Sequence, residues 1–495
     1  MTGDEKRQIA GHTLAYTTSV YVAQLVGMVS GIAVRRFLEP AEMGLWVLLQ
    51  TLLSYALLSE CGILTSMYCR LPVHEAKGEK SEEERVRDVS FSFAFLAAAV
   101  AAAVLAAFAA AGWPGSSRTV RLGLVAAAAG TFATMGYNAF VSFLWAKRGF
   151  ALLSRAVVLN ALLQLGATFT LARAFGLKGL YVSMTVVPAL TLAYVARGSG
   201  VRPRFAPDLR RAGALIRFGL PVFMTGLFYT LFLSLDRWLI TRWLGAEALG
   251  HYSLALVAFS FSAIAPKMFS IVLFPRIQGE IARSGVSGRA VSMVLKPDRA
   301  IAMLSPLVLA AAYFFLPVLV RFFLERYEAG LGAARILLIG SFFLALAYNA
   351  QSFLIALGKR AHPIPFLAFA AALTVAAAWS LVRAGLGVGG VALAMSAGFF
   401  TYFLTLNVYT LRHALSSREV AVHLSEMASV FAYFAVATAR IGALSFSTAP
   451  ALNFLAQTLT FMVVFAPVLW WAERRTGALG TVFRLIFRRS EGRLA

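Results

Sequence analysis

A few ionisable side chains lie inside or at the ends of long apolar stretches, and these are the residues best suited to do chemistry. Asp236 and Arg237 are adjacent at the end of one apolar run, while Glu60 and Lys267 each lie within another. A charge in such a segment costs several kcal/mol if it faces hydrocarbon, so it is expected to face a polar interior. Arginine and lysine can bind an anion there, whereas a carboxylate can hold a counter-charge, a proton or a cation.

Arg237 belongs to a polar stripe at helical spacing. Thr230, Ser234, Arg237 and Thr241 recur at i, i+4, i+7 and i+11, so they share one helix face. The stripe predicts a cationic wall that also offers hydrogen bonds, with Asp236 as counter-charge or coupling group. Two alternatives stay open: Arg237 extends to water beyond the apolar segment, and Asp236 has a purely structural partner.

Glu60 and Lys267 form a second candidate pair. They are 207 residues apart, and an acid and a base at this separation occupy nearly equivalent positions in the two halves of the chain described below. We predict that they pair to close an inner gate, and that an anionic substrate reaching Lys267 competes for this bond. A permanent structural ion pair, or two separate side chains that each extend to water, would explain the same residues.

The first apolar segment carries a stripe of its own. Tyr21, Gln24 and Arg35 lie on it together with Thr17 and Gly31, and they offer donors, acceptors and an aromatic face. Hydrogen bonding between helices explains the stripe equally well. We predict no catalytic residue and no metal site, because the two cysteines lie two helical turns apart and the six histidines are scattered.

The elements that carry these residues are predicted to be membrane-spanning helices. Hydrophobic residues make up 60% of the 495-residue chain and charged residues 14%, which is more apolar surface than a soluble core can bury. Apolar stretches of about 20 residues, the length needed to cross a bilayer, recur from end to end. We predict 14 spans, at about residues 13–34, 44–66, 90–112, 121–145, 152–172, 178–196, 214–241, 249–275, 299–323, 333–356, 363–383, 387–411, 424–446 and 450–472.

Basic residues orient the spans. With the N-terminus in the cytoplasm, 31 of the 45 Lys and Arg residues lie on cytoplasmic segments and 13 on the opposite side, as the positive-inside rule requires. We therefore expect a multi-pass protein of the bacterial inner membrane with both termini cytoplasmic. The net charge of +23 is interpreted as anchoring to anionic membrane lipids rather than as nucleic-acid binding, because the basic clusters adjoin the spans.

The chain is internally repeated. Arg36-Phe37-Leu38 with Gly44 and Trp46 aligns without a gap on Arg242-Trp243-Leu244 with Gly250 and Tyr252, 206 residues later. Two further blocks, YNAFVSFLWAKRG (137–149) with YNAQSFLIALGKR (348–360) and GLKGLYVSM (176–184) with GVGGVALAM (387–395), repeat in the same order. Because six helices separate the copies, the two halves should be related by a pseudo-two-fold axis along the membrane normal.

The predicted fold is thus an all-α polytopic membrane protein with two six-helix lobes and two C-terminal helices. The expected segments are an N-lobe at 1–196, a basic cytoplasmic linker at 197–213, a C-lobe at 214–411, the two additional helices at 412–472 and a basic cytoplasmic tail at 473–495.

The segment RFGLPVFMTGLFYTLFLSLDRWLITRWLGAEALGHYSLA (217–255) resembles the polysaccharide flippases of the multidrug/oligosaccharidyl-lipid/polysaccharide exporter superfamily. RRFLEPAEMGLW (35–46), LSECGILTSMYCR (58–70) and LFPRI (273–277) are also similar to that family, except that Glu39-Pro40 stands where Leu-Gly-Pro is usual. The resemblance implies translocation of a polyprenyl-diphosphate-linked oligosaccharide to the outer leaflet by alternating access. The cargo would be used for surface polysaccharide of the O-antigen or exopolysaccharide kind.

If this resemblance holds, the polar residues gain specific roles. The stripe with Thr230, Ser234 and Arg237 would contact phosphate or sugar, and Lys267 would contact the phosphate. The first-segment stripe would contact sugar hydroxyls through Tyr21, Gln24 and Arg35. Glu60, Lys267 and Asp236 would act in gating or coupling. No cofactor is expected, although coupling to a proton or sodium gradient is an open possibility at Asp236; the expected partners are the lipid-linked substrate, membrane lipids, a polysaccharide polymerase and other assembly proteins.

Two other functions compete with this one. A drug or cation antiporter of the same superfamily would be expected to have twelve helices and to carry organic cations, which a cationic lumen disfavours. A membrane-embedded glycan polymerase or ligase would use the same lipid, but such enzymes need a large outer loop, and the outer loops here are short. We therefore expect no enzymatic activity.

Overall fold

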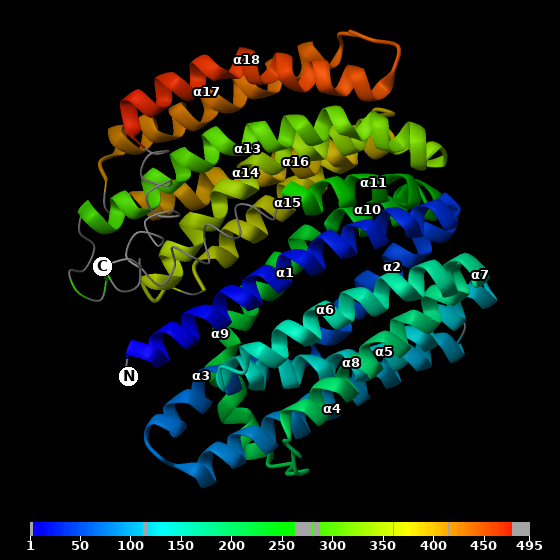
Figure 1. Cartoon of the computed structure of the whole chain (residues 1–495), viewed down its shortest axis with the longest axis vertical. Coiled ribbons are helices and arrows are strands. Elements are labelled where there is room, and N and C mark those ends of the chain that lie inside the picture. The colour runs from blue at the N-terminus through cyan, green and yellow to red at the C-terminus, as the bar shows by residue number, and fades with distance from the viewer. Residues whose placement is uncertain are drawn as a thin grey trace. The chain divides into compact units, whose positions relative to one another are not determined.

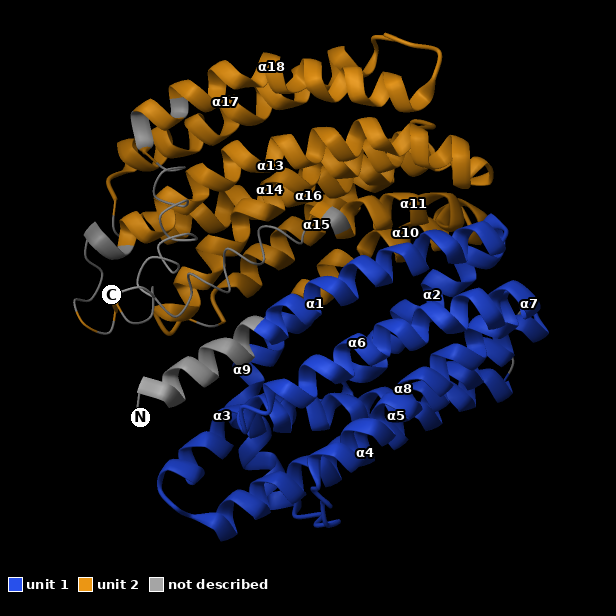
Figure 2. Ribbon diagram, viewed as in Figure 1, with its two compact units in different colours: residues 1–227 blue, residues 228–495 orange. Residues whose placement is uncertain are grey.

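The computed structural model describes residues 3–111, 117–262, 280–281, 283, 288–359, 361–413 and 415–477, with side chains from residue 15 onward except at 261, 288–290, 472, 475 and 476 (Figure 1). The regular structure of these residues is entirely helical, at 89% helix with no strand. This confirms the predicted all-α class. The chain divides into two compact units, residues 1–227 and 228–495 (Figure 2). The boundary lies inside one helix, and the predicted lobe and linker limits stay a prediction.

The first unit contains eight helices, two short helical turns and most of a ninth helix. In chain order these are α1 (Gly3–Phe37), α2 (Pro40–Leu57), η1 (Leu58–Glu60), α3 (Ile63–Ala76), α4 (Lys80–Ala111), α5 (Arg118–Ala146), α6 (Phe150–Ala167), η2 (Thr168–Ala172), α7 (Arg173–Phe175), α8 (Leu177–Ser199) and α9 (Leu209–Leu233). The helix α9 continues past the unit boundary at Leu227.

The second unit holds the end of α9 and the following elements. These are α10 (Leu235–Trp243), α11 (Ala246–Ser262), α13 (Gly288–Phe323), η3 (Glu325–Gly330), α14 (Leu331–Ala356), α15 (Pro363–Arg383), α16 (Gly387–Leu411), α17 (Ser417–Gly442) and α18 (Pro450–Thr476). The helices α17 and α18, which have no counterpart in the sequence repeat, pack on each other and on α13.

Thirteen helices of the described chain are long and apolar enough to cross a membrane. They correspond to the predicted spans apart from the eighth, predicted at 249–275, of which only α11 up to Ser262 falls in the described residues. Lys267 lies outside them.

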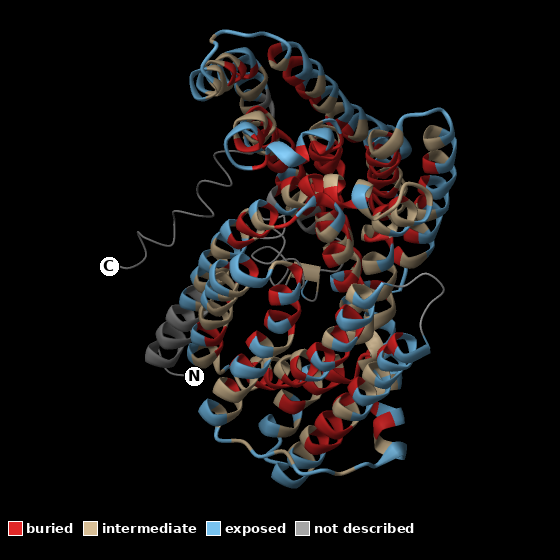
Figure 3. Ribbon diagram, turned by 90° about the vertical axis from the view of Figure 1, so that its right-hand side faces the viewer, coloured by how far each residue is buried: buried red, intermediate tan, exposed pale blue. Residues whose placement is uncertain are grey.

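Helices of the first unit pack small and aromatic residues into a core and expose apolar residues on their outer faces. Inside, Phe91 of α4 packs edge-on against Phe140 of α5, with ring centroids 4.9 Å apart, in a core shared with α3, α6 and α8. On α4, the exposed side chains Leu96, Val100, Val104 and Phe108 recur every fourth residue, so one face is apolar and open. Such a face is expected to contact lipid. Figure 3 shows this pattern, with buried residues gathered inside each unit and exposed residues around it.

Two predicted spans are interrupted. The span predicted at 44–66 breaks at Leu58–Gly62, where Cys61 and Gly62 adopt positive φ values of 51° and 85°. The span predicted at 214–241 breaks at Ser234, between α9 and α10. At Ser234 the side-chain hydroxyl donates to the carbonyl oxygens of Thr230 (2.7 Å) and Leu231 (3.1 Å), and such local bonds compete with the helical ladder.

Candidate functional site

The first unit brings α3 and the start of α9 unusually close together. The Ser66 hydroxyl donates to the Leu215 carbonyl oxygen. A Cβ at Gly219 would collide with the carbonyl oxygen of Gly62 and with the Ser66 hydroxyl. Only a glycine therefore allows the two backbones to approach in this way. This contact fixes the part of α9 that follows the linker beside α3.

With that face of α9 packed inward, the opposite face stays open and lines a groove of about 450 Å³. The groove is lined by five residues of α9 at helical spacing and one of α3, namely Arg210, Gly213, Ala214, Arg217, Phe218 and Arg70. Ala212 and Leu215, on the packed face, are each 4% exposed. The i, i+3, i+4, i+7 and i+8 pattern on α9 thus produces a groove with two arginines from one helix and a third from its neighbour.

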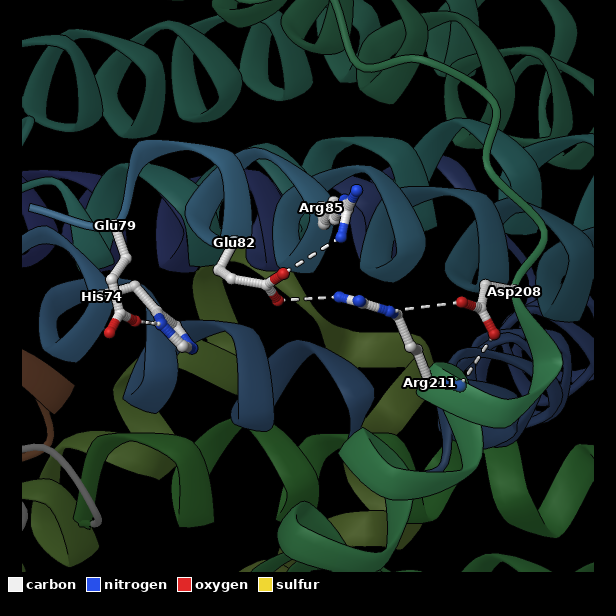
Figure 4. Close-up of polar contacts among 6 residues, drawn as sticks. All are labelled: His74, Glu79, Glu82, Arg85, Asp208 and Arg211. Atoms are coloured by element: carbon white, nitrogen blue, oxygen red, sulfur yellow. Dashed lines mark hydrogen bonds and ion pairs between the residues drawn. The ribbon is translucent and has the colours of Figure 1, made fainter.

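The acidic side chains around this end of the unit are engaged by other bases. Arg211 lies between Glu82 of α4 (2.8 Å) and Asp208 (3.3 Å), and Arg85 also contacts Glu82 (3.2 Å) (Figure 4). Further pairs are Glu79 with His74 at 2.7 Å, Lys147 with Glu75 and Glu83 at 3.3 and 2.6 Å, and Asp88 with Arg87 at 2.8 Å. Among the described residues that line the groove there is no carboxylate. The groove is therefore lined by three positive charges and by no negative charge among the described residues.

Arg70 is held in place by an aromatic ring. Its guanidinium carbon lies 4.7 Å from the centroid of the Phe218 ring, a cation–π contact through the face of the guanidinium, whose N–H groups at the edge can donate to acceptors. Arginine presents a planar fork that matches phosphate oxygens in pairs. Three arginines beside an apolar surface formed by Ala214 and Phe218 can therefore bind a phosphate-bearing head group attached to an apolar chain.

Asp236 has a structural partner in this structure. It is 2% exposed, and the Tyr252 hydroxyl donates to its Oδ2 at 3.0 Å while the Arg237 backbone N–H donates to its Oδ1 at 2.8 Å. Both oxygens are thus hydrogen-bonded, at the first turn of α10, where a negative charge also interacts favourably with the helix dipole. These contacts favour the structural alternative raised for Asp236.

The other predicted lumen residues of the second unit surround the break between α9 and α10. Arg237 is half-buried, and its Nε is buried with no hydrogen-bond partner among the described residues. The hydroxyl of Thr241 donates to the Arg237 carbonyl oxygen at 2.6 Å, and that of Ser234 donates within its own helix to Thr230. The predicted continuous stripe is therefore interrupted at Ser234, and its hydroxyls are used in part by the backbone.

Glu60 is placed at the other helix break. Its Oε2 accepts the backbone N–H of Leu64 at 2.9 Å, so the carboxylate caps the first turn of α3 after the left-handed residues Cys61 and Gly62. Its predicted partner Lys267 lies outside the described residues. The predicted gate between them stays a prediction.

The predicted stripe on α1 is only partly buried. Tyr21 is half-buried and Gln24 is exposed, whereas Arg35 is 5% exposed and its Nη1 donates to the Gly31 carbonyl oxygen of the same helix at 2.7 Å. Tyr21, Gln24, Arg35 and Glu60 belong to the first unit, and Thr230, Ser234, Asp236 and Arg237 to the second. Within the described residues no group of three or more metal-ligating side chains occurs.

Sequence reasoning overlooked the arginines of the groove. Arg210 lies in the predicted basic linker at 197–213, and Arg217 is the first residue of the segment 217–255, but neither is among the predicted site residues. Their spacing of seven residues, with Gly213 and Ala214 between them, is a visible signal for one open helix face. The contribution of Arg70 had no such signal, because it depends on the packing of α3 against α9.

Comparison with protein families now adds to this geometry. The family model described as "Polysaccharide biosynthesis protein" matches residues 9–278. The chain belongs to this family. The match covers more than half of the chain and includes all of the groove, so the resemblance drawn from the sequence is confirmed at the level of a flippase or exporter of that superfamily. The comparison with curated protein sequences gives no match.

Solved structures share the fold. The lipid II flippase MurJ in an inward closed conformation has a TM-score of 0.68 at 14% identity, covering 93% of this chain and 99% of its own. A multidrug resistance MATE family transporter of the MOP superfamily, inward-facing, has a TM-score of 0.66 at 15% identity, covering 83% and 99%. A MOP superfamily transporter from Pyrococcus furiosus has a TM-score of 0.59 at 16% identity, covering 82% and 95%. These neighbours are transporters.

Proposed function

We propose that this protein translocates a polyprenyl-diphosphate-linked oligosaccharide from the cytoplasmic to the outer leaflet of a bacterial inner membrane by alternating access, for surface polysaccharide assembly. The observation that carries the proposal is the groove of Arg70, Arg210 and Arg217, with three positive charges and no carboxylate among the described residues that line it. On the predicted orientation, with both termini cytoplasmic, this groove opens at the cytoplasmic side, where the cargo is made.

The chemistry of the groove suits a diphosphate on an isoprenoid chain. A diphosphate brings several anionic oxygens close together, and more than one guanidinium is needed to compensate them. The carrier lipid must remain in hydrocarbon while the head group enters, and the apolar side chains of Ala214 and Phe218 line the same groove as the arginines. We therefore assign to this groove the first contact with the head group.

Membership of the polysaccharide biosynthesis protein family supports this cargo over an organic cation. A groove with three arginines repels cations, and thirteen candidate spans in the described chain exceed the twelve expected of a drug antiporter. The fold of MurJ, a protein whose cargo is named as lipid II, gives a precedent for lipid-linked substrates on this scaffold. A polysaccharide polymerase and other assembly proteins remain the partners that we propose.

A deletion strain tests the function. Without the protein, lipid-linked repeat units should accumulate on the cytoplasmic leaflet, and the wild-type gene should restore surface polysaccharide. Sensitivity to organic cations without any trapped lipid-linked intermediate would instead support the antiporter and overturn the proposal.

Variants of the groove test its role in the same assay. Each charge-assisted contact to phosphate contributes about 1.5–3 kcal/mol, so the change of Arg70, Arg210 and Arg217 together to Gln should reduce translocation more than about tenfold. The matched control is Arg202→Gln, an exposed arginine of the linker that does not line the groove. Normal translocation by the triple variant would exclude the groove from the pathway.

A variant that fills the groove without changing its charge tests whether the cargo must enter the groove. A Cβ at Gly213 would meet no atom within 4 Å, so Gly213→Leu can fill the groove without displacing its neighbours and without changing a charge. We expect this variant to fold normally and to lose translocation. Gly166→Leu is the control, because Gly166 also has no atom within 4 Å of its Cβ position and lies on α6, outside the groove.

The arginines could also serve only to anchor anionic phospholipid. Binding of a short-chain prenyl diphosphate to the purified protein, compared with binding to vesicles of phosphatidylglycerol, distinguishes the two. Loss of prenyl diphosphate binding in the triple variant supports the proposal, whereas loss of vesicle binding alone would reduce the groove to a lipid anchor.

A further inference from the structure

A buried acid and a buried histidine face each other in the second unit, at a place that the proposed translocation does not use. Asp298 lies on α13 and His423 on α17, with 1% and 2% of their surface exposed. The Oδ2 of Asp298 and the Nε2 of His423 are 3.7 Å apart. This distance is within reach of an ion pair but longer than the roughly 2.8 Å of a charge-assisted hydrogen bond.

The polar atoms of this pair are incompletely hydrogen-bonded. Asn349 of α14 donates to the Oδ1 of Asp298 at 2.7 Å, so one carboxylate oxygen is satisfied. The other oxygen, and both ring nitrogens of His423, are buried and have no hydrogen-bond partner among the described residues. Buried polar groups are almost always paired. Three such exceptions on two adjacent titratable side chains distinguish this pair from the other buried polar groups of the second unit.

We propose that Asp298 and His423 form a proton-binding site at the contact between α13 and α17. In this proposal the imidazole of His423 takes up a proton from cytoplasmic water to give an imidazolium, and returns it to water in the reverse step. The imidazolium attracts the Asp298 carboxylate and draws the two helices together, because a shift of under about 1 Å completes the hydrogen bond. The neutral imidazole releases this attraction.

Histidine is suited to this role because its ordinary titration, near pH 6.5, lies in the range of cytoplasmic and external pH. Both residues also lie toward the start of their helices. Asp298 is the eleventh residue of the 36-residue helix α13, so it lies about 15 Å from the start of the helix. On the predicted orientation this is the cytoplasmic end, and His423 is likewise near the start of α17.

Other charged groups around the pair are already engaged or distant. Arg299, the next residue of α13, is paired with Glu426 of α17 through a contact of 3.0 Å, and it also acts electrostatically on Asp298. On α13, Lys296 is exposed. At the start of α17, Glu419 bonds to Ser416, and in the last turns of α18 Arg474 lies over Trp470. Among the described residues, no group of three His, Cys, Asp or Glu side chains is placed to hold a metal ion.

The neighbouring pair Arg299–Glu426 provides a comparison for the pair Asp298–His423. Both pairs connect α13 to α17, at adjacent positions of α13, but only one contains a histidine. If the contact between the helices were all that mattered, the two pairs would be interchangeable. If a proton is bound, only Asp298 and His423 should confer a dependence on pH.

Proton binding can be measured directly on the purified full-length protein. Histidine labelled with ¹³C gives ring resonances that move when an imidazole titrates, and the His423 resonance is identified by its loss in His423→Gln. We record it between about pH 5 and 8 and expect it to move, with a changed response in Asp298→Asn because the facing carboxylate is gone. A His423 resonance that stays fixed across this range would overturn the proposal, whatever the protein transports.

The effect on transport uses the leaflet assay and therefore rests on the proposed function. Initial rates of translocation in wild type should change severalfold over the same pH range. His423→Gln and Asp298→Asn should each flatten this profile, while His251→Gln keeps it. Arg299→Gln removes a charge that acts on Asp298 but should retain a dependence on pH. If the two variants at Asp298 and His423 remain folded, as judged by size-exclusion chromatography, and keep the wild-type profile, the site does not control transport. A titrating His423 in a protein that carries no lipid-linked oligosaccharide would refute only the proposed function.

Discussion

Asp236 and Asp298 are both buried aspartates on helices of the second unit, yet their surroundings differ. Each oxygen of Asp236 accepts a hydrogen bond, from Tyr252 and from the backbone of Arg237. Asp298 has one oxygen bonded by Asn349 and another that faces His423 at 3.7 Å without a hydrogen bond. The first carboxylate is fully satisfied, whereas the second is left able to respond to a proton.

This difference separates a structural charge from a functional one. Both residues are buried and each is followed by an arginine in the sequence, so a buried charge does not by itself identify a working site. What distinguishes them is the number of donors that reach the carboxylate and the presence of a group that titrates. The following predictions test the comparison by removing donors and charges one at a time.

The largest expected loss of stability comes from removing a hydrogen bond to Asp236, the carboxylate with both oxygens bonded. Tyr252→Phe removes the hydroxyl that donates to Asp236 and leaves a buried oxygen without its partner, which should lower the free energy of unfolding by about 1.5–3 kcal/mol. Denaturation of the detergent-solubilised protein measures this loss. The control is Tyr229→Phe, because the Tyr229 hydroxyl donates at 2.8 Å to the uncharged hydroxyl of Tyr348. A smaller cost at Tyr252 than at Tyr229 would contradict a charged, structural Asp236.

A smaller effect is expected from Asn349→Leu, although this change also removes a donor from a buried carboxylate. His423 lies 3.7 Å from the other oxygen of Asp298, and a shift of under about 1 Å completes a hydrogen bond there. We therefore expect a loss of about 1 kcal/mol in the free energy of unfolding, at the lower end of the usual range. The same denaturation measurement applies, with Tyr252→Phe as the reference. Equal losses in the two variants would mean that His423 gives Asp298 no compensation.

Much of the fold follows from the sequence because lipid imposes a strict length and composition on each helix. The spans and the all-α class were predictable for this reason. The breaks at Leu58–Gly62 and at Ser234 were not, because an isolated glycine or serine in an apolar run is also compatible with a continuous helix. Those breaks decide that Glu60 caps a helix and that the stripe through Arg237 is interrupted.

The candidate site was less predictable, since its residues meet only through tertiary packing. Arg70 and Arg217 are far apart in the sequence, and the glycine contact between α3 and α9 brings their helices together. Asp298 and His423 are separated by three other helices, α14, α15 and α16. No periodicity links such pairs, whereas Asp236 and Arg237 attracted notice because they are adjacent.

The smallest loss of stability is expected at a carboxylate on the surface, where water weakens the ion pair. Glu82 bridges Arg85 and Arg211 at the surface (Figure 4), where water and salt screen the attraction. Glu82→Gln should lower the melting temperature slightly at low ionic strength and leave it unchanged at about 1 M salt, where the screening length is only about 3 Å. Glu84→Gln, at an exposed neighbouring position, is the control and should have no effect at either salt concentration. If Glu82→Gln lost as much stability at high salt as Tyr252→Phe, burial would not be what distinguishes these carboxylates. The contrast between Asp236 and Asp298 would then need another cause.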